Sequence, residues 1–182
     1  MTRRAVLLAL APLLAVAGWA AEEQFAFMPD GGRTILARLV AGLEPDTRQA
    51  VLTREAEADD WADWARAQDP EISEIAAKTL AGYSALNLPL ADAALAKVSP
   101  DDLADALPPD GKDLAIAQCQ FCHSLFSGYL MHDRDETGWK GTFKAPFHTE
   151  IPMTEVERDT FAGYSALNMP LNFEDVPPEW RF

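Results

Sequence analysis

The chain has 182 residues, of which 48% are hydrophobic, and its 29 acidic and 15 basic side chains give a formal net charge of −14. So acidic a surface repels nucleic acid and anionic lipid, and it attracts partners with basic patches in a salt-dependent way. We therefore expect no nucleic-acid partner. The length and apolar content suit one domain or two small ones.

Residues 1–21 have the features of a secretory signal peptide. Arg3 and Arg4 precede an apolar run over residues 5–17, and small residues follow as far as Ala20. The run is shorter than the roughly 20 apolar residues that a membrane span requires, although an uncleaved anchor is an alternative. Cleavage would leave 13 basic and 29 acidic residues, a net charge of −16. We expect a periplasmic protein with no membrane span after cleavage.

Helix signals follow one another through the rest of the chain, and alternating strand patterns are absent. Asp69 and Pro70 predict the cap and first turn of a helix. Thr154 and Glu157 form a capping box that predicts the start of the last helix. The predicted helices cover about residues 69–86, a short segment from residue 99, residues 110–118 and residues 154–167. The predicted fold class is all α.

Both cysteines and one of the three histidines lie in the run Cys119-Gln120-Phe121-Cys122-His123. Positions three and four apart on a helical turn share a face, so Cys119, Cys122 and His123 can contact one object. This Cys-x-x-Cys-His spacing is the attachment signature of c-type haem. The two sulfurs would bond the porphyrin covalently, and the imidazole would bind the iron from the same side as proximal ligand. The sequence thus predicts one covalent haem c.

Other uses of the two cysteines fit less well. A thioredoxin-type pair usually opens a helix after a strand, whereas a helical segment precedes Cys119. A structural zinc site needs four ligands, and the chain has no second cysteine pair. A disulfide between Cys119 and Cys122 would be strained and would close a very short loop.

Residues 108–171 resemble the monohaem class I c-type cytochromes. They contain a first helix with Gly111 that runs into the haem motif, and a last helix with the stretch Ala162-Gly163-Tyr164. The resemblance implies that these two helices cross and hold the haem between them. The order Arg134, Gly138-Trp139, Thr142 is also similar to cytochrome c subunits of periplasmic dehydrogenases. It implies that Trp139 lies beside the haem, where it could hydrogen-bond a propionate; core packing is the alternative.

The sequence departs from that family at the sixth iron ligand. The family has a methionine several residues before the cap of the last helix, whereas this chain has His148 in that window. We favour His148 as the distal ligand. Met153 is an alternative, although it lies directly before the cap, and Met169, after the last helix, suits a hydrophobic C-cap contact better. An open sixth position is the remaining alternative.

An eleven-residue segment occurs twice, because residues 80–90 and 161–171 are identical at nine of eleven positions. Residues 29–31 lie near the same offset from residues 109–111, so the chain looks like two copies of one unit. A helix motif shared by otherwise unrelated segments is the alternative. We expect a cytochrome-like helical unit without haem at residues 22–98 and a monohaem domain at residues 99–182.

Overlaying the copies places Leu39, Gly42 and Leu43 opposite the three haem-binding residues, so the first copy has no haem site. Apolar side chains would have to replace the cofactor there. The candidates are Ile35, Leu36, Leu39, Val40, Leu43, Trp61 and Trp64.

The expected function is single-electron transfer by an exported monohaem c-type cytochrome, either as a soluble carrier or as the electron-accepting subunit of a periplasmic oxidoreductase. The chain would then be an electron-transfer protein rather than an enzyme, and its redox partner would carry a basic docking patch. One alternative is a haem-based sensor or small peroxidase-like enzyme with an exchangeable sixth ligand, in which His132 or His148 acts as acid or base. Another is a haem-free thiol oxidoreductase.

Overall fold

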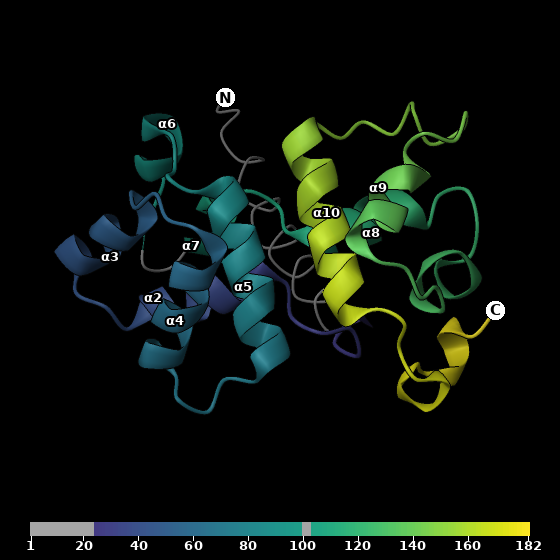
Figure 1. The fold of residues 1–182 in the computed structure, drawn as a ribbon, viewed down its shortest axis with the longest axis horizontal. Helices are drawn as coiled ribbons and strands as arrows, with labels where there is room; N and C mark the ends of the chain where they lie inside the picture. The colour runs from purple at the N-terminus through teal and green to yellow at the C-terminus, as the bar shows by residue number, and fades with distance from the viewer. Residues whose placement is uncertain (1–23, 100–102) are drawn as a thin grey trace, which may run out of the picture.

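The computed structural model describes residues 24–99 and 103–182, and helices are the only regular elements in these residues (Figure 1). The predicted all-α class is confirmed. The predicted signal peptide and the predicted helix start at residues 100–102 lie outside the described part. The first half contains α2 (Gly32–Ala41), α3 (Pro45–Leu52), α4 (Ala58–Gln68), α5 (Glu74–Asn87) and α6 (Asp92–Leu95). The second half contains α8 (Gly111–Cys119), the π-helical turn η1 (Phe126–Leu130), α9 (Glu136–Thr142), α10 (Glu155–Asn168) and the 3-10 turns η2 (Phe173–Asp175) and η3 (Pro178–Trp180). The short helix α7 (Leu103–Ala106) belongs to the segment that precedes α8 of the second half.

The two longest helices begin at equivalent caps. The predicted capping box of α10 is confirmed, because the Thr154 side chain accepts from Glu157 N and the Glu157 carboxylate accepts from Thr154 N. The predicted cap of α5 is wrong. Ser73 caps this helix by accepting from Ala76 N at 3.2 Å, whereas Asp69 ends α4 and accepts from Glu71 N. Asp69 and Pro70 therefore make the turn before the helix, because an aspartate readily bonds its own backbone two residues on.

Helices α5 and α10, which carry the repeated sequence, lie side by side between the two halves (Figure 1). Asn87 Nδ2 donates to Thr160 Oγ1 at 3.0 Å, and Asn168 Nδ2 donates to Thr79 Oγ1 at 3.0 Å. Positions 79 and 160 are equivalent in the repeat, and so are positions 87 and 168, so each half makes the same hydrogen bond to the other. The contact is thus self-complementary, as in a twofold-symmetric dimer, although both halves belong to one chain.

The first helix of each half crosses the last helix at a glycine. A Cβ atom on Gly32 would overlap the Tyr83 side chain, and one on Gly111 would overlap the Tyr164 side chain. These contacts make Gly32 the counterpart of Gly111. The overlay from sequence is therefore wrong by one residue: Val40, Leu43 and Glu44, instead of Leu39, Gly42 and Leu43, lie opposite the haem motif. The first half still offers neither cysteine nor histidine at these positions.

The hydrophobic core is divided into two clusters, and the halves exchange the segments that precede their first helices. Tyr83 Oη donates to Pro108 O at 2.7 Å, and Tyr164 Oη donates to Pro29 O at 2.8 Å. The exchanged side chains are Phe25 and Met28, which pack in the second-half core, and Leu103 and Leu107, which pack in the first-half core. Each core is therefore completed by the other half of the chain.

The side chains predicted to fill the first half all belong to its core or pack against it. Ile35, Leu36, Val40 and Trp61 are buried, and Leu39, Leu43 and Trp64 pack against them. The Trp64 ring meets the Trp61 ring edge to face, with centroids 5.6 Å apart.

None of the helices in residues 24–99 and 103–182 has the length and hydropathy needed to cross a bilayer.

Candidate functional site

Helix α8 presents the predicted haem-binding residues at its C-terminal end. Its start is fixed by a capping box in which the Asp110 side chain accepts from Lys112 N and Asp113 N. Cys119 is the last residue of the helix and is half-buried; Cys122 follows in an exposed turn, and both are free thiols. Both cysteines and His123 line the same pocket. The run therefore directs three reactive side chains into one space, as its spacing predicts.

A second turn holds the ring of His123 in place. Gly128, within η1, packs so closely on this ring that a Cβ atom would overlap Nδ1 and Cε1. Nδ1 itself lies 3.4 Å from the backbone oxygen of Ser124. A side chain at position 128 would displace the imidazole, so the glycine is required by the close approach of backbone and ring.

His148 faces the same pocket from the loop between α9 and α10. Its Nδ1 lies 3.1 Å from the backbone oxygen of Thr142, the last residue of α9. A carbonyl oxygen can only accept, so this bond puts the proton on Nδ1 and leaves the Nε2 lone pair free to bind a metal. The hydrogen bond also fixes the orientation of the ring, as it does for histidine ligands of known metal sites.

The two imidazoles have the separation that ligands on opposite sides of one metal ion require. The ring centroids of His123 and His148 lie 6.4 Å apart, with ring planes at 78°. A ligating nitrogen lies about 1 Å from its ring centroid and about 2 Å from a transition-metal ion, which gives about 6 Å between two such centroids. The separation of the centroids is therefore the one expected for two histidine ligands of one iron.

Trp139, on α9, lines the pocket and is 2% exposed. Its Nε1 is a buried donor without a hydrogen-bond partner among the described residues. The guanidinium of Arg134 lies over the indole, 5.3 Å from the ring centroid. A buried donor left unpaired costs about 1–3 kcal/mol, so an acceptor is expected at this position. A haem propionate is an acceptor of the right kind.

The two candidate methionines lie in different places. Met153 is buried and lines the pocket with the histidines, whereas Met169 does not line it. Met169 is the C-cap residue of α10 and packs in the second-half core. The structure thus brings Cys119, Cys122, His123, Trp139, His148 and Met153 to one pocket and leaves Met169 outside it.

Aromatic side chains form much of the remaining wall of the pocket. Tyr129, Phe143 and Phe161 are buried, and Phe147, at the mouth, is 92% exposed. The cavity holds about 60 Å³, well below the roughly 300 Å³ at the lower end of ligand sites, so its walls would have to move apart to admit a porphyrin. Sequence reasoning missed these residues as well as Gly128 and Thr142. Thr142 acts through a backbone carbonyl, which every residue type has, so no residue pattern could have marked it.

The environment of the half-buried Cys119 argues against thiol chemistry. Burial raises the pKa of the Cys119 thiol to about 12. Reactive cysteines instead have a lowered pKa, because the thiolate is the nucleophile. A group of three or more His, Cys, Asp or Glu side chains placed to hold a metal ion is also absent from the part of the chain that the structure describes. The thiol oxidoreductase and zinc alternatives gain no support from this pocket.

Comparison of the chain with protein-family models, with curated proteins and with solved structures gives no match. The function proposed next depends on the residues of the pocket.

Proposed function

We propose that the chain is a monohaem c-type cytochrome that transfers single electrons. Haem c would be bonded to Cys119 and Cys122, with His123 as proximal and His148 as distal iron ligand. The observation that carries the proposal is the pair of imidazoles, 6.4 Å apart, directly beside the two free thiols. Their spacing is a property of the folded chain, independent of the motif that suggested the haem.

The fold gives the proposal further support. Helix α8 crosses α10 at Gly111 and Tyr164, and the pocket lies beside this crossing with Phe161 of α10 in its wall. Crossed first and last helices with the haem between them are the arrangement that class I c-type cytochromes have. We propose the same fold for the second half, and a related fold without haem for the first half.

His123, His148 and Trp139 then have definite roles. When bound, the haem would supply an iron that alternates between two oxidation states. His123 is held against Gly128, and His148 is oriented by the Thr142 carbonyl. Trp139 Nε1 would donate to a propionate, and the aromatic wall would exclude water from the iron. If His123 and His148 both bound the iron, no position would be left for a substrate, so the site would favour electron transfer over substrate binding.

Two imidazoles predict a lower reduction potential than one imidazole and one thioether, because axial-ligand identity is a main determinant of haem potential. Of the two alternative ligands, Met153 lines the pocket and Met169 does not. A sensor or peroxidase would need an exchangeable sixth position. The anchoring of the His148 ring by a hydrogen bond argues against such exchange.

The chain would act in the periplasm, either as a soluble carrier or as a subunit that accepts electrons from an exported oxidoreductase. Covalent haem attachment by this motif and the apolar segment at residues 5–17 both support export. The net charge of −14 supports a partner with a basic docking patch.

The test combines mass spectrometry with magnetic circular dichroism of the protein purified from its native host. We expect one haem, retained on denaturation and lost in a Cys119→Ala, Cys122→Ala double variant. We expect a low-spin bis-histidine spectrum that is lost in His148→Ala and kept in Met153→Ala and Met169→Ala. A protein without bound tetrapyrrole would refute the proposal. A spectrum unchanged in His148→Ala but lost in Met153→Ala would transfer the distal role to Met153.

A further inference from the structure

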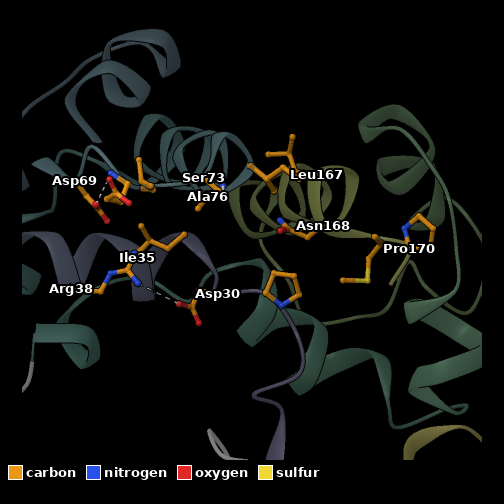
Figure 2. Close-up of a pocket in the computed structure, with 14 residues that line it drawn as sticks. Asp30, Ile35, Arg38, Asp69, Ser73, Ala76, Leu167, Asn168 and Pro170 are labelled. Atoms are coloured by element: carbon orange, nitrogen blue, oxygen red, sulfur yellow. Dashed lines mark hydrogen bonds and ion pairs between the residues drawn. The ribbon is translucent and has the colours of Figure 1, made fainter. Parts of the chain in front are cut away.

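A second cavity, of about 640 Å³, lies at the junction of the two halves (Figure 2). It opens between the start of α2, the turn from α4 to α5, and the C-terminal end of α10. Its volume is within the range of about 300–1,000 Å³ that is typical of ligand sites. We call it the junction groove. It is lined by residues 29, 30, 35, 38, 69, 71–73, 75, 76 and 167–170.

The junction groove combines apolar side chains with an excess of negative charge. Ile35 is buried beneath it, and Ile75 is 53% exposed. Three carboxylates, those of Asp30, Asp69 and Glu71, line it together with one guanidinium. That guanidinium, on Arg38, lies 3.9 Å from Asp30 (Figure 2), so the other two carboxylates remain uncompensated by it.

The residues that line this groove are only partly repeated in the second half. Ile72 of the groove corresponds to Met153, which instead lines the pocket with Cys119, His123 and His148. We call that pocket the haem-site pocket. Three of the four charged residues have uncharged counterparts: the positions of Asp30, Arg38 and Glu71 correspond to Pro109, Ala117 and Pro152, whereas Asp69 corresponds to Glu150. The helical scaffold therefore does not by itself require this set of charges, because most of it is not repeated in the second half.

Helix α10 connects the two cavities. Phe161 contributes to the wall of the haem-site pocket, while Leu167 and Asn168 line the junction groove (Figure 2). Six helical residues span about 9 Å along the axis. Whatever occupies the groove therefore lies close to the site that would transfer electrons.

We propose that the junction groove binds a short basic segment with an aliphatic side chain, displayed by the protein partner in electron transfer. The aliphatic side chain would pack on Ile75, and the basic groups would pair with Glu71 and Asp69. The role of the occupant rests on the proposed function, because only a redox protein requires such a partner. The first half then serves as a docking unit for the second. The charge of the whole chain attracts basic partners, and the groove supplies the local complementarity that selects one contact surface.

The chain offers a matched pair of residues for the test. Ile75 and Val156 occupy equivalent positions at the starts of α5 and α10 and are 53% and 46% exposed. Only Ile75 lines the groove. Ile75→Lys and Val156→Lys therefore change the net charge equally, but only the first variant places a cation in the groove.

The probe is a short fluorescent peptide in which lysine and leucine alternate, titrated into the full-length holoprotein at low salt with anisotropy as the readout. We expect Ile75→Lys to weaken binding at least about tenfold, Glu71→Gln to weaken it less, and Val156→Lys to change it less than about twofold. Equal effects of the two lysine variants would overturn the proposal, because binding would then follow net charge. Competition by spermidine at peptide-like concentrations would also overturn it, because a free polyamine would then satisfy the site.

The visible spectrum of each variant separates this result from the proposed function. We expect it to match that of the unchanged protein, because the groove residues do not line the haem-site pocket. A protein that lacks haem yet binds the peptide through Ile75 would refute electron transfer and leave the groove as a peptide-binding site.

Discussion

The two halves of the chain use one helical scaffold for different purposes, and they differ mainly in two loops. Helices α2 and α3 are joined by residues 42–44, whereas α8 and η1 are joined by residues 120–125, which contain Cys122 and His123. Helices α4 and α5 are joined by residues 69–73, whereas α9 and α10 are joined by residues 143–154, which contain His148. Both imidazoles thus lie in segments that are longer in the second half. A new site can therefore arise from two loops on an unchanged helix pair.

The helices adjust to the same difference. Helix α4 has 11 residues and α9 has 7, so the longer loop in the second half accompanies a shorter helix. Trp61 and Trp139 occupy corresponding places, each with an arginine guanidinium over its ring. Trp61 is enclosed by side chains, whereas Trp139 borders a pocket. The interior of the first half is therefore filled around Trp61, whereas open space borders Trp139 in the second half.

Replacing each tryptophan with alanine compares how tightly side chains pack around Trp61 and Trp139. Trp61→Ala should lower the free energy of unfolding by about 4 kcal/mol, because it leaves a cavity in a packed core. Trp139→Ala should lower it by about 2 kcal/mol, because its surroundings already border open space. Urea unfolding followed by circular dichroism gives both values. Equal losses would show that the two interiors are equally closed.

The helix crossings should be equally sensitive in the two halves. Gly32→Ala and Gly111→Ala should each cost about 3 kcal/mol, since the added methyl overlaps a tyrosine side chain and lies 3.0 Å from a backbone carbonyl. Only Gly111→Ala should also change the haem spectrum, because α8 carries Cys119. The expected losses are measured by urea unfolding.

Gly82 and Gly163 serve as the matched controls for these crossings. A Cβ atom at either position would meet nothing within 4 Å, so alanine should stabilise the helix by up to about 1 kcal/mol. Destabilisation by the control substitutions would contradict the crossing geometry, as would tolerance of alanine at position 111.

A single carboxylate caps the first helices of both halves. Asp110 accepts from Lys112 N of α8 at 3.0 Å and, with its other oxygen, from Arg33 N of α2 at 3.0 Å. Its counterpart in the first half is Gly31, where a Cβ atom would overlap the Asp110 carboxyl group. An aspartate at position 31 would collide with Asp110, so the two halves cannot each supply a capping carboxylate here. The scaffold is therefore asymmetric at this joint.

Burial, together with the neighbouring Asp113 carboxylate, raises the pKa of Asp110 to about 6, above the value of about 3.9 in an unfolded chain. The folded protein therefore holds this proton more tightly than the unfolded one. Tighter proton binding by the folded state adds to the free energy of unfolding. This contribution from Asp110 is fully present below pH 4 and is lost as the pH rises through about 6.

Asp110→Asn should remove this contribution, so the difference in unfolding free energy between the two proteins should change by about 2 kcal/mol between pH 4 and pH 7. Urea titrations at several pH values measure it. Parallel pH profiles of the two proteins would show that the carboxyl group keeps its ordinary pKa.

The sequence predicts those features that depend on residues close together in the chain. The Thr154 capping box, the all-α class and the convergence of Cys119, Cys122 and His123 all follow from spacings of a few residues. The cap of α5 was missed because Asp69 and Ser73 are both good cap residues, and only the path of the chain after α4 selects between them. Local chemistry alone cannot make that choice.

Contacts between distant segments could not be predicted in this way. Phe25 and Met28 pack in the second-half core, and Leu103 and Leu107 pack in the first-half core. This exchange depends on how the halves meet, and the identity of an apolar residue does not indicate which of two cores it will enter. The position of His148 is an intermediate case: its place before the last helix suggested the role, while its bond to the Thr142 carbonyl became visible only in the fold.

The self-complementary contact between α5 and α10 allows the finest comparison of the halves. Asn87 and Asn168 each donate to a threonine of the other half and to the carbonyl of a tyrosine on their own helix, Tyr83 or Tyr164, at 2.9 Å. Asn87→Ala and Asn168→Ala should therefore each lower the free energy of unfolding by about 1 kcal/mol. Because the bonds are equivalent, the two losses should agree within about 0.5 kcal/mol and should add in the double variant. Urea unfolding of the holoprotein measures all three variants. A clearly larger loss for Asn168→Ala would show that the second half depends on this contact more than the first half does, and the halves would then differ in their shared interface as well as in their loops.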